Sequence, residues 1–248
     1  MWGDKLTSQA SLSYMERLPS SQELLWNGFH HATESYILGN RDLDKERSVN
    51  LDVNMLYAHS ENFNSKLSGY YYHFDNYIYQ SPLAQNGVAV SDPFHLSPVW
   101  EIRGLGAKIY GLGIEESYKT SFEKHKFTNT LQLNMLKGEL AGGGYIPRMA
   151  SYNATLSVEH QYNNLTNKIA YKWVDKARNL ADHETPTKGY QLLNASINYE
   201  QKIGKNKLNY WLKGENLTDA IAKNHISFLK NTAPLPGRAF IAGIDYQF

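Results

Sequence analysis

The chain ends on RAFIAGIDYQF, residues 238–248, and this stretch decides the fold. Phe240, Ala242, Ile244, Tyr246 and Phe248 alternate with a second set of side chains (Ala239, Ile241, Gly243, Asp245 and Gln247). Successive side chains of a β-strand point to opposite faces, so this period of two predicts a strand that runs to the last residue. A terminal strand is stable when another strand pairs with it, and we therefore expect a sheet around it.

The same alternation recurs along the whole chain. It predicts about ten strands, each with an apolar and a hydrophilic face, near residues 5–18, 46–60, 62–79, 98–116, 121–137, 149–162, 165–176, 189–201, 207–216 and 237–248. The connections alternate as well. Tight ones are predicted at 60–62, 117–120, 163–164 and 202–206, and long ones at 19–45, 80–97, 138–148, 177–188 and 217–236.

Bulk composition excludes several classes of protein. The net charge of +1 and the pI near 7.8 show no basic surplus, so we expect no nucleic-acid partner. The absence of cysteine excludes disulfides and cysteine metal sites. No signal peptide begins the sequence and no apolar run is long enough for a spanning helix. A mean hydropathy of -0.53 is nevertheless compatible with membrane strands, because alternation averages their hydropathy.

Loop parity favours a membrane barrel. Outer-membrane barrels have short periplasmic turns and longer external loops, and this chain follows that rule strictly. The sequence therefore predicts an all-β, antiparallel transmembrane β-barrel meander with a periplasmic C-terminus and external long loops. The alternative is a soluble β-sandwich or lipocalin-like barrel, whose strands also alternate. Strand length, the 18 tyrosines and the parity favour the membrane protein.

Several motifs resemble the late barrel region of TonB-dependent outer-membrane receptors. An E-R-x-P-S strand end is followed by an A-T-x-x-Y-x-x-G-N-x-x-L-x-x-E-x-S run, here Glu16, Arg17, Pro19, Ser20, Ala32, Thr33, Tyr36, Gly39, Asn40, Leu43, Glu46 and Ser48. FDNYIY (74–79), GGGYIPRM (142–149), GENLTD (214–219), PLPGR (234–238) and the terminal Phe248 follow in the family's order. The resemblance covers essentially residues 1–248.

The resemblance implies a C-terminal segment of a larger barrel. Family members are barrels of about 22 strands filled by an N-terminal plug, and residues 1–248 supply neither the plug nor a TonB box. It also implies a monomer in contact with outer-membrane lipid that admits a metal or metal chelate, with the TonB energy complex acting only through the plug. No enzyme activity and no resident cofactor are expected. The alternative is a self-standing ten-stranded barrel that serves as a protease-like enzyme or a passive pore.

Histidines in the predicted external loops are the candidate metal ligands. Imidazole together with carboxylates such as Glu34, Asp92, Asp182 and Glu184 suits zinc or another borderline divalent metal. HHATESYILGN and AKNHISFLKNTAPLPGR are similar to the zinc-uptake branch of the family, which singles out His30, His31, His183 and His225. This similarity slightly favours zinc as the transported ligand. The competing ligands are an iron siderophore and haem, which would use aromatic and basic residues such as Trp26, Phe29 and Arg41. Solvated loop residues without a ligand are the plain alternative.

A protease would need a loop Asp and His that activate water. Asp182 with His183, and Asp92 with His95, are the pairs that could do so. The sequence contains neither G-x-S-x-G nor H-E-x-x-H, so we expect no catalysis.

Overall fold

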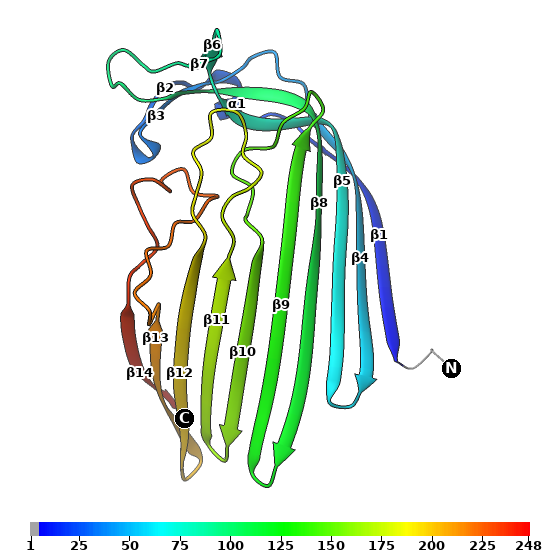
Figure 1. Cartoon of the computed structure of the whole chain (residues 1–248), viewed down its shortest axis with the longest axis vertical. Coiled ribbons are helices and arrows are strands. Elements are labelled where there is room, and N and C mark those ends of the chain that lie inside the picture. The colour runs from blue at the N-terminus through cyan, green and yellow to red at the C-terminus, as the bar shows by residue number, and fades with distance from the viewer. Residues whose placement is uncertain (1–4) are drawn as a thin grey trace.

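A computed structural model describes residues 5–248. Its main feature is one large antiparallel sheet of long strands (Figure 1). Ten strands follow one another across it: β1 (Leu6–Arg17), β4 (Glu46–Ser60), β5 (Phe63–Pro82), β8 (Val99–Phe122), β9 (His125–Leu140), β10 (Asn153–Tyr162), β11 (Leu165–Val174), β12 (Tyr190–Ile203), β13 (Asn206–Glu215) and β14 (Ala239–Gln247). All ten predicted strands, and the all-β class, are confirmed.

Small elements lie in the long connections that were predicted without any. The first holds helix α1 (Ser21–Leu25), strand β2 (Asn27–His30), the 3-10 turn His31–Thr33 and strand β3 (Ser35–Leu38). Strand β3 pairs with β2 and runs parallel to the start of β8. The second holds the hairpin of β6 (Ala84–Gln85) and β7 (Val88–Ala89). Among residues 5–248, no helix is long and apolar enough to cross a membrane.

One predicted turn was misplaced. The connection expected at 117–120 lies at residues 123–124, because the ladder between β8 and β9 continues to the pair Phe122 and His125. Polar residues at 117–120 suggested a turn, yet they are paired strand residues. The remaining tight turns lie where they were predicted, and all of them are at the end opposite the long loops (Figure 1).

The two faces of the sheet differ in chemistry. The register aligns exposed apolar side chains on one face across all ten strands: Leu12, Leu51, Tyr71, Tyr118, Leu133, Leu156, Ile169, Ile197, Leu212 and Ile244. We call it the apolar face. The other, the polar face, carries Asp52, Ser68, Gln132, Thr155, Lys172, Ser196, Lys213 and Asp245.

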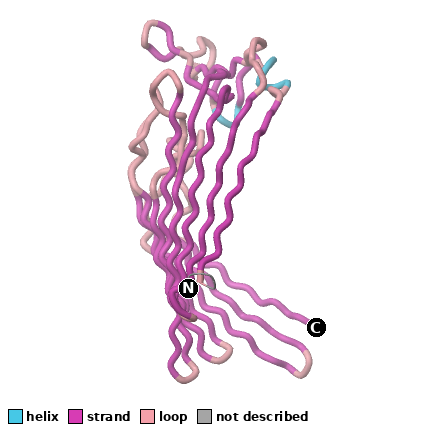
Figure 2. Tube along the Cα trace, turned by 90° about the vertical axis from the view of Figure 1, so that its right-hand side faces the viewer, coloured by secondary structure: helices cyan, strands magenta, loops and turns pink. Residues whose placement is uncertain are grey.

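The sheet is open. Within residues 5–248, β1 pairs only with β4 and β14 only with β13, and the two edges lie on opposite sides of the molecule (Figures 1 and 2). The arrangement is a curved wall, and the alternative of a closed ten-stranded barrel does not describe it. Each edge strand presents unpaired backbone groups that another strand can bind.

The small buried core lies at the loop end of the polar face. Phe74 and Ala107 of the sheet pack there against Ile146 of the 141–152 loop, which is 2% exposed. Ile146 and Met149 lie so close to Gly138 that a Cβ there would come within 2.9 Å of both side chains. The GGGYIPRM segment is therefore a folded-back loop that fills this core.

A glycine on the polar face, Gly111, makes room for the ring of Tyr70, which generates a stability prediction. A Cβ at Gly111 would overlap the Tyr70 ring and lie 2.7 Å from the Met135 carbonyl oxygen, whereas a Cβ at Gly113 would meet nothing nearer than 3.4 Å. We expect Gly111→Ala to lower the free energy of unfolding by about 1–3 kcal/mol through overpacking. Thermal unfolding in detergent measures the loss. The matched Gly113→Ala variant should stay close to wild type, and equal destabilisation by both would contradict the assignment.

Candidate functional site: the loop junction and the lysine cavity

The three loops that follow β9, β11 and β13 meet at one carboxylate. Glu184 lies in the second of these loops, and its Oε1 is 3.1 Å from the Nζ of Lys230 in the third. The backbone N–H of Arg148, in the first loop, donates to the same oxygen at 2.9 Å, and the N–H of Ala181 donates to Oε2 at 3.0 Å. His225 Nε2 lies 3.1 Å from Oε1, although its direction is too poor for a hydrogen bond.

An aromatic sandwich completes this assembly. The guanidinium of Arg148 lies 3.7 Å from the ring centre of Phe228 and 5.0 Å from that of Trp100, at the start of β8. Both distances are within cation-π range. We call Trp100, Arg148, Glu184, His225, Phe228 and Lys230 the loop junction. It joins three long loops to the sheet.

Burial and charge determine the ionisation of the junction. Burial alone would raise the pKa of Glu184, but the contact with His225, the Ala181 N–H and the charge of Lys230 outweigh it and lower that pKa to about 2. Burial lowers the pKa of Lys230, and it lowers the pKa of Arg148 to about 10. At neutral pH the loop junction therefore contains one carboxylate, that of Glu184, and two cations, Lys230 and Arg148.

The GENLTD and PLPGR motifs close the base of the third loop. Asn216 is 4% exposed and left-handed, with φ of 47°. Its Nδ2 donates to the carbonyls of Ala220 (2.9 Å) and Pro236 (3.1 Å), and its Oδ1 accepts from the Ala220 N–H (2.9 Å). Asp219 Oδ1 accepts from the N–H of Arg238 at 2.9 Å. These two motifs are structural clamps.

The other motifs have similar roles. Ser20 caps helix α1 in a reciprocal pair with Glu23. Arg17 joins that Glu23, at 2.8 Å, to Glu46 of β4, at 3.3 Å. Asn76 of FDNYIY donates to the carbonyls of residues 44 and 45. The residues that carry the resemblance thus fix the loops to the sheet.

A cavity of about 120 Å³ lies beneath the loop junction, against the polar face. Three lysines from three different segments line it: Lys172 of β11, Lys188 before β12 and Lys223 of the third loop. The carboxylate of Asp175 also lines the cavity, but it is paired with Arg178. We call this space the lysine cavity. Its excess of positive charge suits an anion.

The predicted metal ligands lie in different places. His225 is buried, and its Nδ1 lies 2.8 Å from Thr187 Oγ1 and 3.2 Å from Lys230 Nζ. His183 belongs to the second loop, exposed and with φ of 59°. His30 contacts Thr33 Oγ1 through Nδ1 at 2.8 Å. His31 packs edge-on against Phe29, with ring centres 5.0 Å apart.

The structure does not bring these four histidines together. Across residues 5–248, no group of three or more His, Cys, Asp or Glu side chains is arranged to hold a metal ion. Metal binding by His30, His31, His183 and His225 stays a prediction.

One of the two Asp-His pairs is in contact. Asp92 Oδ2 lies 2.6 Å from His95 Nδ1, whose ring stacks on Phe29 at 4.0 Å. Burial alone would raise the pKa of Asp92. The hydrogen bonds from the His95 ring and backbone N–H outweigh burial, so the net effect is a lowered pKa. In the part of the chain that the structure covers, Asp182 and His183 form no hydrogen bond or ion pair. The contacting pair fixes the second long loop against the β2–β3 hairpin.

Sequence reasoning missed Arg148 and Lys230. They lie 36 and 46 residues from Glu184, in different loops. Arg148 is part of GGGYIPRM and Lys230 of AKNHISFLKNTAPLPGR, but neither residue type is a usual zinc ligand, so neither was singled out. Only the register of the strands between them brings their loops to one place.

The low pKa of Glu184 generates a pH prediction. A carboxyl whose pKa falls on folding stabilises the junction above its ordinary pKa of 4.5, and this stabilisation is lost as the pH falls toward 2. Spin labels at His183→Cys and Ile221→Cys should show one narrow distance at neutral pH and a broad distribution near pH 2. With Glu184→Gln the distance distribution should be broad at neutral pH and at pH 2. With Glu200→Gln it should match that of the doubly labelled parent at both pH values. A pH-independent distance in the parent would contradict the account.

The Asn216 clamp generates a proteolysis prediction. Asn216→Ala removes three side-chain hydrogen bonds, each worth about 0.5–1.5 kcal/mol. We expect trypsin to cleave after Lys223 and Lys230 about tenfold faster or more. Asn224→Ala, in the same loop, loses one long 3.4 Å bond and should cleave at the wild-type rate. Equal rates for the two variants would show that Asn216 does not hold the loop.

Comparisons with known proteins agree with this architecture. A family model described as "TonB dependent receptor-like, beta-barrel" matches residues 2–217. Among solved structures, "Copper transporter OprC" has a TM-score of 0.77 at 17% identity, covering 99% of this chain and 38% of the other. The FrpB iron transporter from Neisseria meningitidis (F5-1 variant) has a TM-score of 0.69 at 18% identity, and the match covers 99% of this chain and 38% of the transporter.

The siderophore receptor PirA from Acinetobacter baumannii gives a TM-score of 0.66 at 15% identity, covering 100% of this chain and 40% of the other. At such low identity these likenesses concern the fold, and the chain spans about two fifths of each relative's length. The family match covers most of the chain. The chain therefore belongs to the TonB dependent receptor-like β-barrel family.

Proposed function

We propose that residues 1–248 form the C-terminal part of the barrel wall of a receptor that admits a metal chelate across a Gram-negative outer membrane. The apolar face would contact lipid, the long loops would be external and the C-terminus would be periplasmic. The observation that carries the substrate class is the lysine cavity beneath the loop junction. Family membership and the open, two-faced sheet support the receptor assignment.

An anionic chelate suits the lysine cavity better than a bare cation. Lys172, Lys188 and Lys223 would repel a divalent ion and attract carboxylate or catecholate oxygens. In the loop junction above the cavity, Arg148 Nη1 is buried and has no hydrogen-bond partner among the described residues, and a guanidinium N–H can only donate, so it would be satisfied by an acceptor. The substrate we favour is an iron siderophore or a similar negatively charged complex.

Zinc is the second candidate. It rests on His30, His31, His183 and His225 in the long loops, where the imidazoles that reach solvent could collect the metal before entry, although His225 is buried. Haem is a further chelate that would use aromatic residues such as Trp26 and Phe29, and Phe29 already stacks on His95.

The polar face would receive the plug. Its turn end holds a hollow of about 410 Å³ lined by asparagines, glutamines and charged side chains, among them Asn198, Glu200, Lys207 and Asp245. A plug docked there would give the TonB energy complex its contact with the receptor. We propose a monomeric receptor without enzymatic activity, and the names of the matched relatives, transporters and receptors, support the receptor role.

The lysine cavity is tested by uptake in cells that produce the protein. The triple variant Lys172→Gln, Lys188→Gln, Lys223→Gln should lower uptake of a labelled ferric tricatecholate by about tenfold, because three attractive charges are lost. A matched triple at the tight turns (Lys124→Gln, Lys202→Gln, Lys205→Gln) should transport at the wild-type rate.

Labelled zinc measured in the same cells separates the two candidates. Zinc uptake that falls with alanine at the four loop histidines but not with the lysine triple would favour zinc. Wild-type chelate uptake by the lysine triple would contradict our substrate class.

A further inference from the structure

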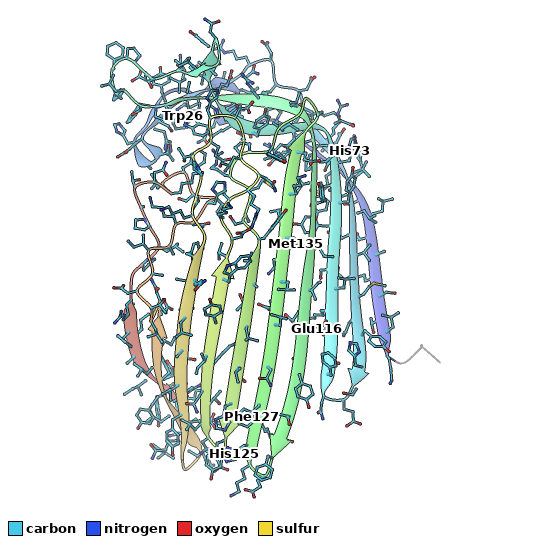
Figure 3. The ribbon with its side chains drawn as sticks, viewed as in Figure 1. Trp26, His73, Glu116, His125, Phe127 and Met135 are labelled. Atoms are coloured by element: carbon cyan, nitrogen blue, oxygen red, sulfur yellow. The ribbon has the colours of Figure 1, made fainter. Side chains whose placement is uncertain are left out.

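The apolar face contains a groove that the receptor function does not explain. Its volume is about 590 Å³, in the range of small-ligand sites. It crosses β4, β5, β8 and β9, and its lining is mainly apolar: Leu51, Val53, Tyr71, Leu112, Met135 and Tyr152. Met135 is labelled in Figure 3, at mid-height on β9.

A glycine creates the groove. Gly69 lies on the apolar face between its cross-strand partners Val53 and Leu112. A Cβ there would meet nothing nearer than 3.9 Å, so the space above Gly69 is open. Neighbouring side chains rise around this gap and form its walls. The depth of the groove therefore depends on a residue without a side chain.

The groove lies at a fixed height on the sheet. Tyr71 pairs with Tyr110 and Tyr110 with Lys137, so one rung places two phenols and an ammonium at its loop-side end. Lys137 lies ten positions along β9 from Phe127, which stacks on His160 near the tight turns (Figure 3). At about 3.3 Å per residue and a tilt near 40°, that span is about 25 Å, the height of a barrel's apolar band. The rung would thus lie where acyl chains meet headgroups.

The rim of the groove is cationic. Lys137 Nζ lies 2.6 Å from Glu139 Oε1 and 5.3 Å from the ring centre of Tyr145. Lys108 is the cross-strand partner of Glu139 and has no ion pair among the side chains of residues 5–248. Glu139 is paired with Lys137, and Asp75, which lines the same hollow as Lys108, lies 3.8 Å from His73 Nε2, so the ammonium of Lys108 keeps its charge beside the apolar groove without an ion-pair partner in the described part of the chain.

We propose that this groove is a binding site for one phosphorylated membrane lipid. One acyl chain would lie over Gly69 between Val53 and Leu112, and the phosphate would contact Lys108 and Lys137 beside the tyrosine hydroxyls. The apolar lining of the groove matches the acyl chain of such a lipid, and the lysines at its rim match the phosphate. The site rests on the proposed membrane orientation of the apolar face, but it involves none of the residues of the lysine cavity.

Native mass spectrometry of protein extracted from its own outer membrane, delipidated in detergent, tests the site. Didecanoyl phosphatidylglycerol and didecanoylglycerol share their chains and differ in the phosphate headgroup. Wild type should retain one phosphatidylglycerol. Gly69→Leu should weaken phosphatidylglycerol binding about tenfold or more, because the leucine side chain would displace at least two methylenes of the acyl chain from the groove. Ala242→Leu places the same leucine side chain on the apolar face of β14, away from the groove, and should bind as wild type does.

The double variant Lys108→Gln, Lys137→Gln keeps the groove and tests the rim even if Gly69→Leu fails to fold. It should bind phosphatidylglycerol no better than didecanoylglycerol. Undiminished binding by Gly69→Leu, an undiminished preference for the phosphate lipid in the double variant, or a dimer in place of the lipid adduct would each overturn the proposal. None of these results involves uptake, so the site and the receptor function fail independently.

Discussion

The structure depends on a two-residue period that recurs across ten paired strands and is interrupted only by register shifts in the ladders of β5 with β4 and β8. Pairing satisfies the backbone inside the sheet, and the period sends apolar side chains to one face and hydrophilic ones to the other. A sheet exposed in this way needs an apolar medium on one side and a wet one on the other. Its two unpaired edges, β1 and β14, allow the wall to continue into a larger barrel.

The loops follow from the same constraint. Because the meander returns every long connection to one end, segments far apart in sequence meet there, as Arg148, Glu184 and Lys230 do (Figure 1). The junction fixes three loops together and leaves a lysine-lined space against the polar face. Motifs such as GENLTD and PLPGR act as clamps at the loop bases, which gives a physical reason for their spacing.

Strands were predictable from the sequence because each carries its own periodic signal. The missed turn at 123–124 shows the limit, since the polar residues before it are part of the ladder. Short elements such as β2 and β3 depend on a parallel contact with β8 that no local pattern contains. Glu184 was noted only as a carboxylate near the loop histidines, because its partners come from other loops. The groove over Gly69 needed the register of three strands.

The most direct test uses the absence of native cysteine. Single spin labels placed in turn at residues 154–159 and 194–199 of the protein in membranes would report collisions with oxygen, which dissolves in lipid, and with a water-soluble nickel complex. The account predicts that oxygen dominates at positions such as Leu156 and Ile197, and nickel at their neighbours Ser157 and Asn198, alternating with period two. Equal accessibility to nickel on both faces would contradict a membrane wall with one lipid-facing side.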